Sequence, residues 1–213
     1  MPIYVRSVGE GIVSNNRTQS FFLNLLKAIN RLRYRDLDIS SNNVTVNWEH
    51  IPQLPRVGDT LTITGSTTPE AKVRVKVSFE KKVPVTDGKY EYNMDKVEIP
   101  DGPNHFTIKA RKAKDLNFSV KMFITFTRTF EANSDEAIYS EENVPSGNYD
   151  ISIHGQAKEG EKEVTIYLEA VEVIDTDNEG KFTYNYNTAA LPPGDFTVLV
   201  GDSDRTISLS AAI

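Results

Sequence analysis

The sequence predicts a mainly β protein, with two similar antiparallel β-sandwiches in tandem after an N-terminal segment that contains one α-helix. Three observations lead to this prediction. Apolar and polar residues alternate over short runs from Val57 onward, turn-forming residues separate the runs, and the second half of the chain repeats the first. A chain of 213 residues is long enough for two such domains and a short extension.

The N-terminal segment, residues 1–53, contains the one predicted helix, over residues 19–33. Its apolar side chains recur at the three- and four-residue spacing of a helix face. Thr18 lies directly before the run and is a suitable N-cap. The apolar face needs a surface to cover it, which is either the first sandwich or a partner. The residues of this face are Phe22, Leu25, Leu26, Ile29 and Leu32.

The first sandwich is predicted over residues 54–132. Its runs have the two-residue period of strands that are buried on one face, and Val73 to Phe79 is the clearest example. Turns are predicted between runs at Asp87-Gly88 and at the Pro-Asp-Gly-Pro sequence of residues 100–103. Short strands joined by turns, with no helix between them, are typical of a sandwich or barrel. The other alternating runs are 61–63, 90–92, 106–110 and 118–126.

The second sandwich is predicted over residues 133–213, because this half repeats the first in the same order. The shared residues are turn glycines, aromatic residues two apart and a Pro-x-Gly sequence, all of which have structural roles. The repeat therefore encodes a fold and not a chemistry. A polar stretch at residues 131–136 marks the junction. The corresponding segments, about 90 positions apart, are 60–65 with 149–155, 88–92 with 180–184, and 100–108 with 192–198.

Three segments carry a resemblance to a known family. Residues 58–67 read Gly-Asp-Thr-Leu-Thr-Ile-Thr-Gly-Ser-Thr, residues 177–184 read Asp-Asn-Glu-Gly-Lys-Phe-Thr-Tyr, and residues 191–198 read Leu-Pro-Pro-Gly-Asp-Phe-Thr-Val. Together they resemble the tandem Ig-like repeats of archaeal cell-surface and S-layer-associated proteins. The resemblance covers roughly residues 57–209 and implies Ig-like sandwiches with an extracellular structural or adhesive role. It implies no catalytic residues.

Composition narrows the classes of function. The formal net charge is -6, from 24 basic and 30 acidic residues, which does not favour binding to nucleic acid or to an anionic membrane. The chain contains no cysteine, so disulfides, thiolate nucleophiles and cysteine-ligated zinc are excluded. No apolar run reaches the roughly 20 residues of a membrane span. Residues 1–6 lack the pattern of a signal peptide, so the expected extracellular or cell-envelope location depends on the resemblance alone.

The sequence holds no pattern of catalytic residues, and we expect a protein that is not an enzyme. It has no Gly-x-Ser-x-Gly elbow and no phosphate-binding glycine loop, and its three histidines are far apart. A group of glutamates could in principle form the paired carboxylates of a glycosidase. Alternation directs Val164, Ile166 and Leu168 toward the core, and we expect the glutamates to face solvent or to lie at strand ends. These glutamates are Glu159, Glu161, Glu163, Glu169 and Glu172.

The turn that begins at Asp175 is the one candidate metal site. Asp175, Asp177 and Glu179 precede Gly180 at the spacing of the first half of an EF-hand calcium loop. The twelfth position holds Tyr186 instead of a bidentate glutamate, and both flanks read as strand. Calcium binding and a plain acidic hairpin turn are therefore alternatives at this place, and no other cofactor is expected.

Three residues are candidates for contact with a partner. Trp48 offers a flat ring that could hold a sugar, or that could pack between the N-terminal segment and the first sandwich. Phe123 and Arg128 break the alternation of the longest predicted strand, over residues 118–130. The expected partners are proteins, surface glycans or further copies of the chain. We expect a structural or adhesive cell-surface protein; the alternatives are a carbohydrate- or calcium-binding module, or accessory domains of a larger secreted enzyme.

Overall fold

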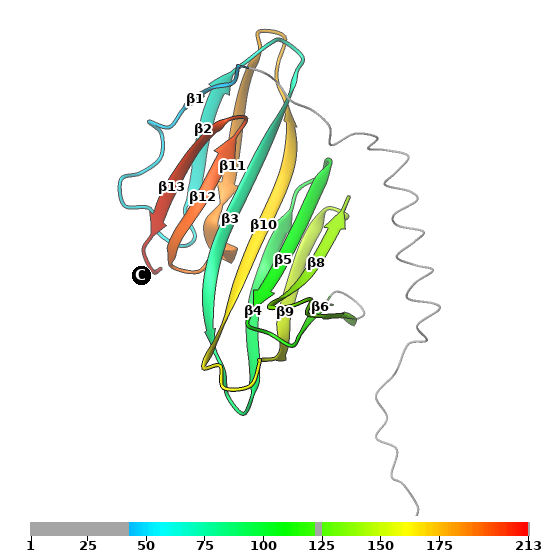
Figure 1. Ribbon diagram of the computed structural model, residues 1–213. Coiled ribbons are helices and arrows are strands. Elements are labelled where there is room, and N and C mark those ends of the chain that lie inside the picture. Colours follow the sequence, from blue (N-terminus) through cyan, green and yellow to red (C-terminus); the bar gives the residue numbers. More distant parts are fainter. Residues whose placement is uncertain (1–42, 122–124, 213) are drawn as a thin grey trace, which may run out of the picture.

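Strands make up nearly all of the regular structure in the computed structural model, which describes residues 43–121 and 125–212 (Figure 1). The mainly β class expected from the sequence is therefore confirmed. The predicted helix over residues 19–33 and the candidate contact residue Phe123 both lie outside the described residues. In the described part of the chain, no helix is both long enough and apolar enough to span a membrane.

The strands form three sheets, in which all neighbouring strands are antiparallel. The three-stranded sheet has the order β1 (Thr45–Asn47), β2 (Thr60–Ser66), β11 (Lys181–Asn187), and the 3-10 helix η1 (Thr188–Ala190) follows β11. The four-stranded sheet has the order β4 (Lys89–Ile99), β9 (Gly147–Gln156), β6 (Asp115–Lys121), β7 (Thr125–Glu131). The six-stranded sheet has the order β13 (Ser203–Leu209), β12 (Gly194–Val200), β3 (Lys72–Pro84), β10 (Glu163–Asp175), β5 (Asn104–Arg111), β8 (Glu136–Glu142).

Each sheet combines strands from both halves of the chain. β2 pairs with β11, β4 pairs with β9, and β3 pairs with β10 and β12. The sheets therefore do not divide at the predicted boundary between residues 132 and 133. The reason lies in β3 and β10, which are 13 residues long and have no turn-forming residue inside them. Each of these strands runs from the core under the three-stranded sheet to the core under the four-stranded sheet instead of folding back.

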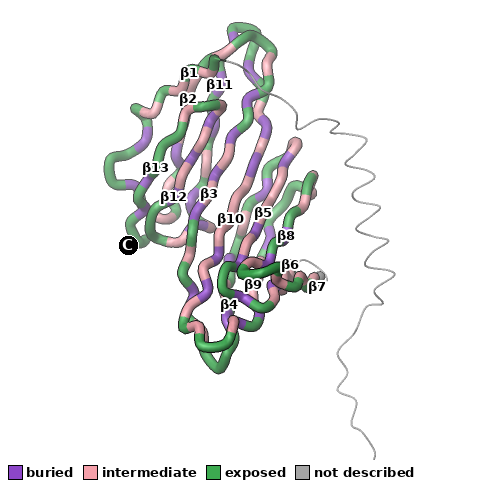
Figure 2. The backbone as a smooth tube through the Cα atoms, in the orientation of Figure 1, coloured by how far each residue is buried: buried purple, intermediate pink, exposed green. Residues whose placement is uncertain are grey.

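β3 and β10 form a continuous ladder through the middle of the molecule. They pair from Lys72 with Asp175 to Pro84 with Glu163, and they lie side by side along the whole six-stranded sheet (Figure 1). Buried residues follow both strands along this length (Figure 2). The three-stranded sheet covers one end of the six-stranded sheet, and the four-stranded sheet covers the other end of the same face.

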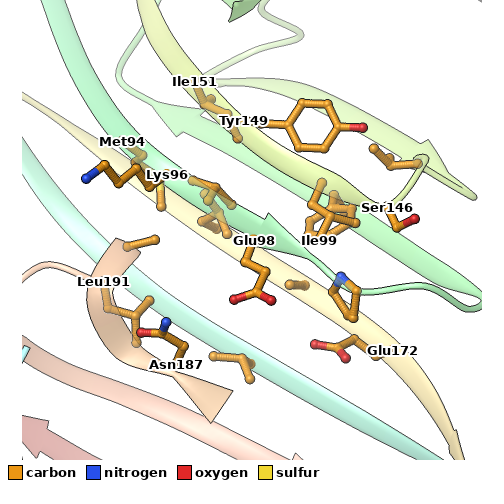
Figure 3. Close-up of a pocket in the computed structure, with 18 of the residues that line it drawn as sticks. Met94, Lys96, Glu98, Ile99, Ser146, Tyr149, Ile151, Glu172, Asn187 and Leu191 are labelled. Atoms are coloured by element: carbon orange, nitrogen blue, oxygen red, sulfur yellow. The ribbon is translucent and has the colours of Figure 1, made fainter. Parts of the chain in front are cut away.

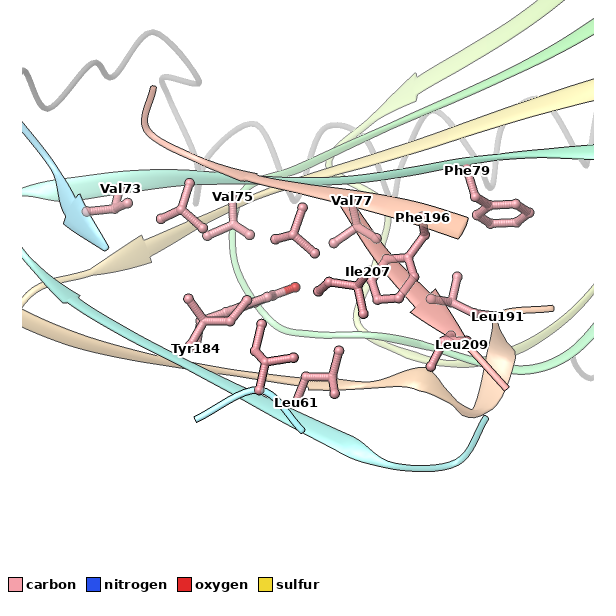
Figure 4. Close-up of a cluster of buried hydrophobic side chains, with 14 of the residues drawn as sticks. Leu61, Val73, Val75, Val77, Phe79, Tyr184, Leu191, Phe196, Ile207 and Leu209 are labelled. Carbon is pink, nitrogen blue, oxygen red and sulfur yellow. The ribbon is translucent and has the colours of Figure 1, made fainter. Parts of the chain in front are cut away.

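Two clusters of buried side chains hold these layers together. The first core lies under the three-stranded sheet (Figure 4), and the second core lies under the four-stranded sheet. Tyr92, Ile151 and Leu168 are partly buried and pack against both. The first core contains Leu61, Ile63, Val73, Val75, Val77, Phe79, Phe182, Tyr184, Phe196 and Val198. The second core contains Tyr90, Ile108, Ala110, Leu116, Tyr139, Ile153, Val164 and Ile166.

A glycine opposite an aromatic residue occurs in both repeats, and each such pair joins the two halves of the chain. Phe182 of β11 lies opposite Gly65 of β2, and Tyr90 of β4 lies opposite Gly155 of β9. A Cβ atom at Gly65 would overlap the Phe182 ring, and one at Gly155 would overlap the Asp115 oxygens and crowd the Tyr90 ring. The missing side chain therefore makes room for the ring at Gly65, and for Asp115 and the ring at Gly155.

The interleaved pairing predicts that neither half of the chain folds alone. We expect residues 43–132 and residues 133–213, produced as separate chains, to lack a cooperative thermal transition, because each core then misses several of its strands. When the two chains are mixed, we expect one cooperative transition and a 1:1 complex. Circular dichroism during heating and analytical ultracentrifugation measure these results. Cooperative unfolding of each fragment by itself would show instead that the halves are separate modules.

Candidate functional site

A cavity of about 760 Å³ lies between the two cores, on the covered face of the six-stranded sheet (Figure 3). β3, β5 and β10 form its floor. β4, β6 and β9 line one side, and β11 with η1 lines the other. The two smaller sheets thus meet above the central strands without filling the space between them. The floor residues are Val77, Phe79, Phe106, Ile108, Leu168 and Ala170.

A β-bulge in β4 shapes one edge of the cavity. The register with β9 shifts between Met94 and Val97, so β4 has an extra residue at this place. Lys96 has a φ of 55°, and its backbone N–H donates to Asp150 Oδ1 at 3.1 Å. Because the extra residue reverses the alternation, Val97 is partly buried and the Lys96 side chain lies exposed at the rim.

The other edge of the cavity forms where β11 gives way to η1. Asn187 is the N-cap of η1, and its side-chain oxygen accepts a hydrogen bond from the Ala189 N–H at 2.9 Å. η1 contacts β4, so the edges of the two smaller sheets meet here. Because the 3-10 turn ends β11 at Asn187, this strand does not extend across the cavity.

Glu172 of β10 is the acidic residue in the floor of the cavity. The Tyr184 hydroxyl donates a hydrogen bond to Glu172 Oε1 at 2.7 Å. Burial raises the pKa of the Glu172 carboxyl group, the Tyr184 hydrogen bond opposes this effect, and the Glu98 carboxylate adds to it. Glu98 itself is exposed on β4 and lines the same cavity (Figure 3).

Glu172 departs from the expectation that the glutamates of this region face solvent. It lies on the same face of β10 as Val164, Ile166 and Leu168, because even-numbered residues of this strand point toward the cores and the cavity. The alternation that directs these three apolar residues inward also directs Glu172 inward. The inward direction of Glu172 therefore follows from the sequence alternation of this strand.

Two tyrosines form an aromatic wall next to Glu172. The rings of Tyr184 and Tyr186 stack with centroids 6.1 Å apart, and Tyr186 packs against Phe196 at 6.3 Å. Burial raises the pKa of both tyrosine hydroxyls, and the charge of Glu172 raises them further. Both hydroxyls therefore stay protonated at neutral pH and can donate hydrogen bonds.

An ion pair lies at the end of the cavity nearer the second core. Arg128 of β7 binds Glu141 of β8 at 3.0 Å, and the Glu141 side chain is only 12% exposed. The Tyr139 hydroxyl donates to the same carboxylate at 3.5 Å, and its ring stacks on Phe118 at 4.4 Å. Arg128, which the sequence suggested as a partner contact, thus makes an intramolecular ion pair at the cavity.

The three carboxylates of the candidate calcium loop do not form a cluster. Asp177 Oδ1 accepts the backbone N–H groups of Glu179 at 2.9 Å and Lys181 at 2.8 Å, as in a side-chain-stabilised turn. Asp175 lies 3.7 Å from the Lys72 ammonium group. Within the two described ranges, no three histidine, aspartate or glutamate residues are placed to hold a metal ion.

Trp48 packs against the first core, and its polar groups are used within the chain. Its indole N–H donates to Ser203 Oγ at 3.3 Å, and its carbonyl accepts a hydrogen bond from Arg205 at 3.0 Å. These contacts join the segment before β2 to β13. Both hydrogen-bond partners, Ser203 and Arg205, belong to the predicted second sandwich and not to the first.

A serine, a histidine and a glutamate lie together on the outer face of the six-stranded sheet. His105 Nε2 is 2.7 Å from Ser140 Oγ, and His105 Nδ1 is 3.6 Å from Glu142 Oε1. The group resembles a nucleophile with its base, but none of the three residues lines the cavity. Acyl transfer also needs a bound substrate and donors for the developing oxyanion. Only the pairing of β5 with β8 brings these residues together, so the sequence alone could not reveal them.

Comparison with known proteins gives no family for this chain: no family model matches it, and neither does any curated protein.

The raised pKa of Glu172 predicts a pH-dependent effect of Glu172→Gln. An unfolded glutamate has a pKa of about 4.3. Because burial raises the pKa in the folded protein, the stability associated with this group is fully present below the unfolded pKa and is lost as the pH rises through the folded pKa. We expect the variant to melt at a higher temperature than the natural protein at pH 8, and at nearly the same temperature at pH 4.

Thermal melting between pH 4 and pH 8 measures this difference. Glu159→Gln is the matched control, because Glu159 is exposed and lies outside the cavity. A difference between Glu172→Gln and the natural protein that stays constant with pH would show that burial does not perturb Glu172.

Proposed function

We propose that the chain is a non-catalytic binding protein whose ligand occupies the cavity between the two cores. The volume of about 760 Å³ supports this proposal, together with walls that are mainly apolar and polar groups that are few. Pockets that hold small organic ligands have volumes of about 300–1,000 Å³ and this kind of lining. The polar groups at Glu172 and at Arg128 would fix the orientation of the ligand.

The cavity opens to solvent at its rim, where Lys96 and Glu98 are exposed. Water can therefore enter it, and water against an apolar wall makes few hydrogen bonds. An apolar ligand that displaces this water gains free energy.

The lining favours binding over catalysis. Among the described residues, no histidine and no cysteine lines the cavity. Arg128 is already paired with Glu141, and Glu172 accepts a hydrogen bond from Tyr184. These existing contacts support a role for both groups in orienting a ligand.

Nile red, a neutral dye that fluoresces in apolar surroundings, tests the proposed function. We expect one molecule to bind per chain, and Ala170→Trp to remove binding because the indole fills the space above β10. Thr206→Trp, on exposed β13, is the matched control and should leave binding unchanged. Fluorescence titration measures the affinity and the ratio. If the natural protein fails to bind, or if Ala170→Trp binds as well as Thr206→Trp, the ligand-binding function is wrong.

A structural or adhesive role at the cell surface is the second candidate. The interleaved strands favour it, because the two sandwiches cannot separate without breaking the ladder between β3 and β10. A protein built in this way is a stiff unit, and the edge strands of its sheets can contact proteins, surface glycans or further copies of the chain. The resemblance to tandem Ig-like repeats of archaeal cell-surface and S-layer-associated proteins supports the same role and an extracellular or cell-envelope location.

The location of the native full-length product tests this second role. We expect intact cells to expose it to an added protease and to a membrane-impermeant biotin reagent. A cytoplasmic marker protein serves as the control for cell integrity. Recovery of the whole product, unmodified, in the cytoplasmic fraction would exclude the surface role and leave ligand binding as the function.

A further inference from the structure

We propose that the cavity selects an elongated amphiphile with a protonated amine, and that Glu172 is the counter-ion of that amine. The inference rests on the proposed function, since it names the ligand class for the same cavity. The positions of the charged groups and of the apolar side chains around the cavity support this ligand class.

Glu172 lacks a cationic partner within the described chain. Its carboxylate receives one hydrogen bond, from Tyr184, although a carboxylate can accept about four. The neighbouring floor residues Ala170 and Leu168 are apolar. A carboxylate that is partly buried among apolar groups is costly to ionise unless a cation compensates for the lost hydration. A ligand amine at this place would supply both the charge and the missing hydrogen bonds.

The other charges of the cavity favour a cation over an anion. Arg128 is neutralised by Glu141 at 3.0 Å. Lys96 and Glu98 both lie exposed at the rim on β4, and their formal charges are opposite. The charge that is left over is that of Glu172, so an anionic head group such as a fatty-acid carboxylate would be repelled.

The lining of the cavity offers one place for the ligand's amine and another for its alkyl chain. Tyr184 and Tyr186 line the cavity beside Glu172, so aromatic groups adjoin the position proposed for the ammonium group. From Glu172 to Leu168 the floor extends roughly 13 Å along β10, at about 3.3 Å per residue. The apolar side chains of Phe118 and Ile151 continue the wall toward the second core. This length suits an unbranched alkyl chain.

Decylamine and decanoate, which share an alkyl tail of similar length and differ in the charge of the head group, test the proposal. Both are titrated into the protein at neutral pH, below their critical micelle concentrations, with displacement of Nile red as the readout. We expect decylamine to displace the dye at a concentration at least about tenfold lower than decanoate does. A charge-assisted hydrogen bond contributes about 1.5–3 kcal/mol, which corresponds to this factor or more.

Glu172→Gln separates the role of the charge from that of the cavity. A cooperative melt and the binding of Nile red show that this variant is folded and that its cavity is intact. The ratio of its decylamine affinity to its Nile red affinity should be about 10- to 100-fold lower than in the natural protein. Glu159→Gln should change that affinity by less than about threefold, because Glu159 is exposed and does not line the cavity.

The outcomes distinguish the two proposals. Equal affinities for decylamine and decanoate, or an unchanged decylamine affinity in Glu172→Gln, would overturn the amine assignment while the bound dye keeps the binding function. Failure of Nile red to bind the natural protein would overturn the binding function itself, and the amine assignment with it.

Discussion

The antiparallel ladder between β3 and β10 is the interaction on which the rest of the structure depends. β3 supplies residues 73–79 to the first core, whereas β10 supplies Val164 and Ile166 to the second. Because each strand runs the length of the sheet, each core rests on strands from both halves of the chain. Leu168 and Ala170, near the middle of the ladder, form part of the cavity floor. The cavity thus has its most firmly paired strands beneath it, which is where a binding site needs rigidity.

The sequence predicts the strands well because their signals are local. Alternation and turn glycines depend on neighbouring residues, and the structure has strands wherever these signals were clear in the described ranges. The choice of partner strand is different, because both repeats carry the same glycine and the same aromatic position. Gly65 could pair with Tyr90 of its own repeat or with Phe182 of the other, and either choice satisfies the alternation. The choice between these two partner strands depends on whether β3 turns back after Phe79. It does not, and the absence of one turn is a weak sequence signal.

The sequence could predict one residue of the candidate site, but not the β-bulge or the cavity. The inward direction of Glu172 follows from the alternation of β10, so sequence reasoning could reach it. The bulge at Lys96 could not be read in advance, since no glycine or proline marks it and only the register with β9 reveals it. The cavity exists because two smaller sheets meet above a third, and that is a property of long-range packing. The calcium loop had a sequence signal, yet Asp177 serves the turn backbone instead.

The interleaving has a consequence for how such a chain can arise. A shorter ancestor with a single copy of the repeat could complete these two cores only by exchanging strands with a second molecule, as a symmetric dimer. Fusion of the two copies converts that association into an intramolecular one, so that assembly no longer depends on protein concentration. After fusion, the two copies can also diverge in sequence. A charged residue such as Glu172 can then appear in the cavity from one copy alone. In a symmetric dimer, the same substitution would introduce two charges of the same sign.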